Sequence, residues 1–171
     1  MQTFVRLSVG LTPDQTTMVI FGTLIFATLL QPIYGALSDR IGRKPLLIFF
    51  GAVGTIATVP ILMTLKDAKS PFIAFLLICA AWIFVAGYTS INAIVKAELF
   101  PTNVRALGVG LPYAITVSIF GGTAPAVALA FKSAGHEEWF YYYLSGMIFL
   151  SLIIYSTMRD TKHESAMHRH E

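Results

Sequence analysis

Five long apolar stretches constrain this sequence more than any other feature. They run over residues 16–37, 45–65, 71–95, 106–131 and 140–158. The hydrocarbon core of a bilayer is about 30 Å thick, and a helix needs roughly 20 residues to cross it. Backbone groups in lipid must be hydrogen-bonded within the segment, and no stretch shows the period-two alternation of a membrane strand. We therefore predict an all-α integral membrane protein with five transmembrane helices.

Composition supports this class and excludes several others. Hydrophobic residues make up 56% of the 171 residues and charged residues only 12%, against about 25% charged residues in soluble domains. The apolar content excludes a disordered chain, and the single cysteine, Cys79, excludes a disulfide scaffold. The net charge of +3 arises from short basic runs between the apolar stretches. We therefore expect a lipid bilayer, and no nucleic acid, as a partner.

The loops between the stretches predict the orientation of the chain. Lysine and arginine concentrate on the cytoplasmic side of membrane proteins. One side carries eight of these residues and the other carries four. We therefore expect the richer side, and with it the tail 159–171, to face the cytoplasm from the plasma membrane, which is the inner membrane in bacteria. The richer side comprises Arg40, Arg43, Lys44, Lys96, Arg105, Arg159, Lys162 and Arg169.

The most specific pattern is GALSDRIGRK, over residues 35–44. A basic stop between two membrane helices explains its three cations by itself. It does not explain Gly35, which allows a second helix to approach closely, or Gly42, which allows a backbone conformation closed to other residues. Asp39 and Arg43 are free to pair with charges on a neighbouring loop. The candidate site residues of this pattern are Gly35, Asp39, Arg40, Gly42, Arg43 and Lys44.

A second pattern, KAELFPTNVRALG, covers residues 96–108 after the third stretch. Its Glu98 and Arg105 are free to join a charge network with Asp39 and Arg43. Ion pairs at a wet surface are cheap to break. We therefore expect these four residues to form a latch between two conformations rather than a permanent link.

Together the two patterns resemble the major facilitator superfamily of transporters. The Gly-x-x-x-Asp-Arg-x-Gly-Arg-Lys loop at residues 35–44 is similar to the superfamily's signature loop, in the copy that occurs in its second half. The run ELFPTNVRALGVG at residues 98–110 is similar to the metabolite:proton symporter group, and within it to the branch of α-ketoglutarate permeases. The similarity covers about residues 1–158.

The resemblance implies that the five stretches are helices eight to twelve of a twelve-helix fold. Residues 1–158 would then form most of one half of a carrier, and Met1 would be an internal methionine. The resemblance also implies proton-coupled transport of a small organic acid such as α-ketoglutarate, with two halves rocking about a central site. The implied partners are the substrate, protons and a missing N-terminal half, so we expect no transport by this chain alone.

Two alternatives stay open. The pair Pro125-Ala126 stands where the α-ketoglutarate permease pattern has Glu-Tyr, and a proline there is more similar to betaine and proline carriers. A proline/betaine-type or other metabolite symporter is therefore the first alternative. The second is a free-standing five-span membrane binding or assembly protein, or an inactive remnant, because fold and function can separate.

Polar residues within the stretches are the candidates for lining a transport cavity. No Asp or Glu lies in the middle of a stretch, so we expect the main proton-coupling carboxylate in the missing half. Each candidate also has a structural interpretation, a hydrogen bond to a neighbouring helix. The resemblance favours Tyr88, Asn92 and Tyr113, since the family's tenth and eleventh helices line its cavity. The full set is Gln31, Tyr34, Tyr88, Asn92, Tyr113 and Thr116.

No pattern predicts an enzyme, a cofactor site or a metal site. No glycine-rich phosphate loop follows a strand, and no nucleophile is paired with a base. Several histidines lie in the tail 159–171, but their spacing differs from the His-Glu-x-x-His pattern of zinc proteases. We expect a solvated tail there.

Overall fold

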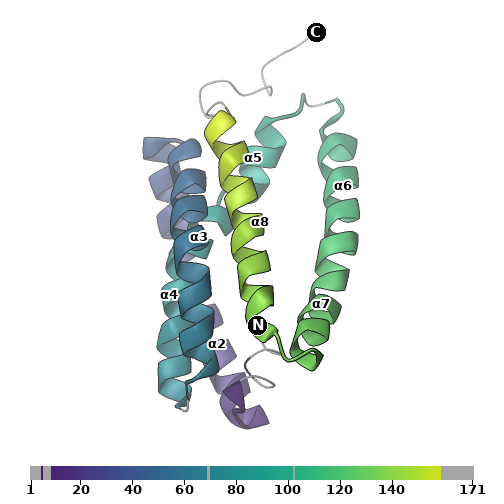
Figure 1. The fold of residues 1–171 in the computed structure, drawn as a ribbon. Coiled ribbons are helices and arrows are strands. Elements are labelled where there is room, and N and C mark those ends of the chain that lie inside the picture. The colour runs from purple at the N-terminus through teal and green to yellow at the C-terminus, as the bar shows by residue number, and fades with distance from the viewer. Residues whose placement is uncertain (1–4, 6–8, 69, 102, 159–171) are drawn as a thin grey trace.

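The computed structural model describes residues 5, 9–68, 70–101 and 103–158, and its described residues form helices and their connections. Five of the helical segments are long and apolar enough to cross a membrane, which confirms the predicted fold class. The elements are α2 (Pro13–Ile41), α3 (Lys44–Lys66), α4 (Pro71–Thr89), α5 (Asn92–Glu98), α6 (Arg105–Thr116), the π-helix η2 (Val117–Gly121), α7 (Gly122–Ser133) and α8 (Glu137–Thr157) (Figure 1).

Local sequence signals set where the helices begin and end. Thr12 and Gln15 form a capping box, in which Gln15 N donates to Thr12 Oγ1 at 3.3 Å, so α2 begins before its apolar stretch does. A proline lies in the first turn of α2, α3 and α4, where its missing N–H leaves no helical bond unmade. Gly42, with a φ of 97°, ends α2. Polar residues thus extend α2 beyond residues 16–37 at both ends.

Two of the five segments are not continuous α-helices. The segment Pro71–Glu98 is interrupted at residues 90–91, between α4 and α5. The segment Arg105–Ser133 passes through η2, whose last residue, Gly121, precedes Pro125 by four positions. Pro125 has no N–H to donate to the Gly121 carbonyl, so the ladder of α-helical hydrogen bonds is broken at that point.

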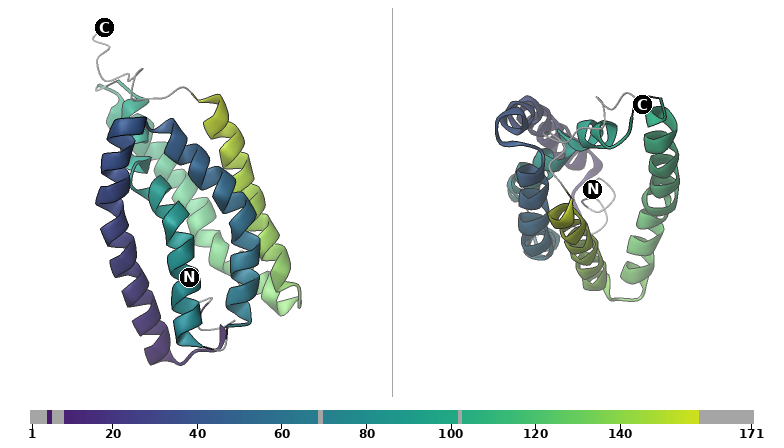
Figure 2. Two further views of the ribbon diagram at one scale, coloured as in Figure 1. Left: turned by 90° about the vertical axis from the view of Figure 1, so that its left-hand side faces the viewer. Right: turned by 90° about the horizontal axis from the view of Figure 1, so that it is seen from above.

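Four of the segments pack together, and the remaining one stands apart. α2 packs on α4, and α3 packs on both α4 and α8 (Figures 1 and 2). The segment formed by α6, η2 and α7 meets its neighbours mainly at its ends, where α6 follows α5 and α7 precedes α8. None of its residues is buried. Its exposed apolar side chains therefore need lipid or another protein surface around them.

Close packing between α3 and α8 depends on two glycines. A Cβ added at Gly51 would lie 2.8 Å from Leu152 Cβ and 3.1 Å from Leu152 Cα. A Cβ added at Gly54 would lie 3.2 Å from Ile148 Cγ2. Lipid provides little hydrophobic drive for helix association, so this close approach, which small residues allow, is a main source of the packing energy.

A methyl group at Gly51 should therefore destabilise the chain. We expect Gly51→Ala to lower the free energy of unfolding by about 1–3 kcal/mol, because Leu152 must shift. Gly146→Ala in α8 is the matched control, since a Cβ there meets nothing within 4 Å. The measurement is loss of helical circular dichroism on heating in detergent. Equal melting of the two variants would contradict the assigned role of Gly51.

Candidate functional site

The loop between α2 and α3 folds Arg43 back against the last turn of α2. Gly42 is buried and donates its N–H to Ser38 O at 3.0 Å. Its φ of 97° is strained for any residue with a Cβ, and this is the conformation that the sequence led us to expect. The turn brings the guanidinium of Arg43 beside Ser38 and Asp39.

Arg43 is the centre of a charge cluster that joins two parts of the chain. Its Nη1 donates to Asp39 Oδ1 at 2.7 Å and to Ser38 Oγ at 2.9 Å, and its Nη2 donates to Glu98 Oε1 at 3.4 Å. Glu98 is the last residue of α5, so the cluster links the α2–α3 loop to the third segment. The side chains of Arg43 and Glu98 are 12% and 9% exposed, and that of Asp39 is 69% exposed. We name Asp39, Arg43 and Glu98 the arginine cluster.

The guanidinium of Arg43 stays charged at every physiological pH. Burial lowers the pKa of Arg43, but its hydrogen bond to Asp39 and the negative charge of Glu98 raise it, and the net result is a raised pKa. An arginine pKa lies far above neutral pH even without such partners. Titration of Arg43 therefore does not open the cluster.

Arg105 has a different place from the one predicted for it. Its Nε donates to Phe100 O at 3.3 Å, in the loop before α6. Its Nη2 is buried and makes no hydrogen bond to a described residue. The four-residue network expected from the sequence is therefore corrected: the described residues show a three-residue cluster, and Arg105 is held by its own loop. The physical reason is that a neighbouring backbone carbonyl lies within its reach.

The other residues of the loop pattern lie around the cluster. Arg40 is exposed in the last turn of α2, and Lys44 is the half-buried first residue of α3. A Cβ added at Gly35 would meet no described residue of another helix within 4 Å. The close helix approach expected at Gly35 is thus not made by this part of the chain, and it stays a prediction about a further helix.

Two of the predicted cavity residues make hydrogen bonds between α2 and α4. Gln31 Nε2 donates to Thr89 Oγ1 at 2.8 Å, and the Tyr34 hydroxyl donates to Ile83 O at 2.6 Å. Such bonds satisfy polar groups that lipid cannot. For Gln31 and Tyr34 the structure therefore shows the structural role that the sequence left open.

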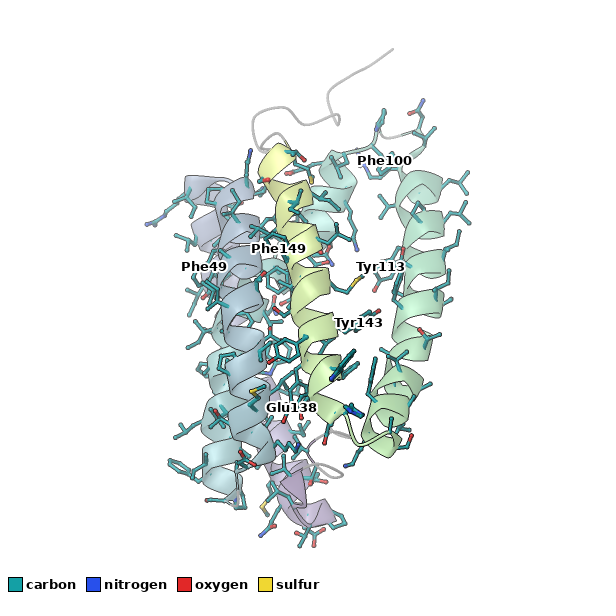
Figure 3. The ribbon with its side chains drawn as sticks, viewed as in Figure 1. Phe49, Phe100, Tyr113, Glu138, Tyr143 and Phe149 are labelled. Carbon is teal, nitrogen blue, oxygen red and sulfur yellow. The ribbon has the colours of Figure 1, made fainter. Side chains whose placement is uncertain are left out.

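The other four predicted cavity residues lie on the third and fourth segments. Tyr88 in α4 stacks on Phe50, with ring centroids 4.8 Å apart. Asn92 is the half-buried first residue of α5, and Thr116 is the exposed last residue of α6. Tyr113 is 53% exposed and points from α6 toward the other segments of the bundle (Figure 3). Their role in lining a cavity stays a prediction.

Lys96 is a residue whose place in a helix we did not predict from the sequence, because we assigned Lys96 to a charged loop. The structure continues α5 to Glu98 and so includes Lys96 in the third segment. Its Nζ lies 4.2 Å from the centre of the Tyr113 ring, within the range of a cation–π interaction. The sequence signal that could have found it is spacing, since Lys96 follows Asn92 by four residues and so shares its helix face.

The described residues form a partly open pocket of about 150 Å³ between α2 and α4. It contains none of the predicted cavity residues and no charged group, so it offers no means of binding an organic acid. Metal ligands are not gathered in the part of the chain that the structure describes, and the tail 159–171 with its histidines lies outside that part. The pocket is lined by Ile20, Thr23, Leu24, Ile78, Ala81, Trp82 and Val85.

Comparison with known proteins assigns the family. A sequence model described as Major Facilitator Superfamily matches residues 1–169. The chain belongs to the Major Facilitator Superfamily. This assignment confirms the resemblance that rested on residues 35–44 and 98–110. No solved structure matches the chain significantly.

Similar proteins within the superfamily are named as transporters. The chain is 43% identical over 154 residues to the α-ketoglutarate permease of Escherichia coli (strain K12). This match covers 90% of the chain and 36% of the relative. It is 34% identical over 100 residues to a citrate-proton symporter of Salmonella typhi, covering 58% of the chain and 23% of the relative. It is 32% identical over 129 residues to the ectoine/proline transporter ProP of Corynebacterium glutamicum. This match covers 74% of the chain and 25% of the relative. The matches thus span 23% to 36% of the length of these relatives.

The arginine cluster predicts unequal effects of its two carboxylates on stability. Glu98→Gln leaves the largely buried Arg43 without its buried counter-charge and should cost about 3 kcal/mol of unfolding free energy. Asp39→Asn removes an exposed partner and should cost less than about 1 kcal/mol. Thermal unfolding in detergent measures both. In an Arg43→Leu background, Glu98→Gln should cost much less; an undiminished cost there would show that Glu98 acts through another group.

Proposed function

We propose that the chain is part of a proton-coupled secondary transporter for a small organic acid such as α-ketoglutarate. The observation that carries the proposal is the 43% identity over 90% of the chain to an α-ketoglutarate permease. The citrate-proton symporter among the relatives also moves a small carboxylate, by its name, together with protons. In this proposal the chain acts in transport and not in an enzymatic reaction.

In this proposal the five segments are helices eight to twelve of a twelve-helix carrier. Residues 1–158 form part of its C-terminal half, and an N-terminal half supplies the other wall of the substrate site. The open side of α6, η2 and α7 supports this, since Leu107, Leu111 and Ile115 are more than half exposed. The described segments carry Asp and Glu only near their ends. The main proton-coupling carboxylate therefore belongs to the other half.

The arginine cluster serves as a latch in this carrier. Its contact between Arg43 and Glu98 joins the α2–α3 loop to the end of α5, so it favours the conformation in which these two parts lie together. Asp39 lies beside Arg43 at the end of α2, so it stays paired with Arg43 when the two parts separate and leaves this cation one counter-charge in the open conformation. A transport cycle needs such a balance, because neither conformation can be favoured by many kcal/mol.

We further propose that the latch faces the cytoplasm of a bacterium from its inner membrane. The end of the bundle that holds the latch also holds the last residue of α8, so residues 159–171 follow from that end (Figure 1). Basic residues gather at the same end, as the positive-inside rule requires of a cytoplasmic side. They are Arg40, Arg43, Lys44, Lys96 and Arg105.

A proline- or betaine-type substrate is the second candidate. The ectoine/proline transporter covers 74% of the chain at 32% identity, and Pro125 lies where the sequence departs from the α-ketoglutarate permease pattern. A zwitterionic substrate carries no net charge, so the two candidates differ in the electrostatics that their site requires.

The proposal predicts uptake by a full-length carrier in which this chain replaces the matched segment of the Escherichia coli α-ketoglutarate permease. Proteoliposomes with an inward proton gradient should accumulate radiolabelled α-ketoglutarate, and a protonophore should abolish the accumulation. The chain alone should give no uptake, because half a carrier supplies only one wall of the substrate site.

The unaltered permease in the same vesicles is the control for this uptake experiment. Accumulation of proline or betaine, in place of organic acids, would replace the first candidate by the second. A joined carrier that inserts normally but accumulates neither class of substrate would refute the proposal.

A further inference from the structure

A lysine in the third segment lies beside a tyrosine and away from the arginine cluster. Lys96 precedes Glu98 by two residues, and two residues turn an α-helix by about 200°. Glu98 points to Arg43, so Lys96 projects from the other side of α5, where it meets Tyr113 of α6. No described carboxylate lies within ion-pair distance of Lys96.

Tyr113 positions this ammonium without neutralising it. Nζ lies 4.2 Å from the ring centre, so the π-face attracts the cation. A ring carries no net charge, and the positive charge of Lys96 therefore stays available to an anion. The Tyr113 hydroxyl makes no hydrogen bond to a described residue and can donate one to the same anion.

Asn92 adds a third donor on the same side. It precedes Lys96 by four residues, so the two side chains share one face of α5. Asn92 is half-buried, and its amide makes no hydrogen bond within the described chain. An ammonium and a phenol thus lie together, with an amide one helical turn away on the same face of α5, and all three can donate to a carboxylate oxygen.

We propose that Lys96, Tyr113 and Asn92 bind a carboxylate of the transported acid and select acids over zwitterions. Lys96 lies two residues before the end of the third segment, beside Tyr113 and with no described carboxylate within ion-pair distance, so a carboxylate that arrives with the substrate can supply its counter-charge. A dicarboxylate brings a net negative charge to Lys96, whereas a betaine brings no net charge because its quaternary ammonium offsets its carboxylate. This inference rests on the proposed organic-acid transport and assigns the residues that recognise its substrate.

Uptake kinetics of the joined carrier test the assignment. Lys96→Gln should raise the KM for α-ketoglutarate by at least about tenfold, because a charge-assisted hydrogen bond is lost. Lys96→Arg keeps the charge and should recover most of the affinity. Tyr113→Phe keeps the ring and loses the hydroxyl, so its KM should lie between those of the wild type and Lys96→Gln. Lys66→Gln, at the opposite end of the bundle, is the matched control and should leave the KM unchanged.

A second measurement covers the case in which a Lys96 variant fails to insert. The wild-type joined carrier is treated with an amine-acylating reagent, and the modification of Lys96 and Lys66 is quantified by mass spectrometry of peptides. α-Ketoglutarate should protect Lys96 and leave Lys66 reactive, and betaine should protect neither.

The outcomes separate this inference from the proposed function. An active wild-type carrier whose KM is unchanged by Lys96→Gln, or whose Lys96 gains no protection from α-ketoglutarate, overturns the inference and leaves the function standing. A joined carrier that inserts but takes up no organic acid overturns the function and the inference with it.

Discussion

Every backbone polar group of a chain in lipid needs a partner within the chain, and the rest of this structure depends on that need. It explains why long apolar stretches become helices whatever their side-chain details. Specific packing therefore depends on a few places where helices approach closely or form hydrogen bonds with each other. Gly51 and Gly54 allow the first against α8, and Gln31 and Tyr34 supply the second against α4.

Charge has a different role at each of two cations near one end of the bundle. Arg43 has its counter-charges within the chain, so its interactions stabilise a conformation. Among the described residues, Lys96 has an aromatic neighbour in place of a carboxylate, and we propose that its charge is available to a substrate. In the carrier that we propose, Arg43 holds a conformation and Lys96 recognises the substrate.

Sequence patterns predicted the five segments, the family and the conformation of Gly42, because each depends on local chemistry or on a short motif. They did not predict the partner of Arg105, which is a neighbouring carbonyl and not a distant carboxylate. They also left Lys96 in a loop, because helix ends depend on tertiary contacts such as that between Glu98 and Arg43. The sequence also did not predict that the fourth segment stands apart, since its composition matches that of the segments that pack together.

The π-helix η2 changes what the fourth segment presents along its length. A π-turn holds one more residue than an α-turn, and one residue corresponds to about 100° of rotation. The stripe of side chains that contains Tyr113 on α6 therefore does not continue straight onto α7. The segment contacts α5 near one end and α8 near the other. A single rod can thus match two neighbours whose surfaces lie in different directions around its axis.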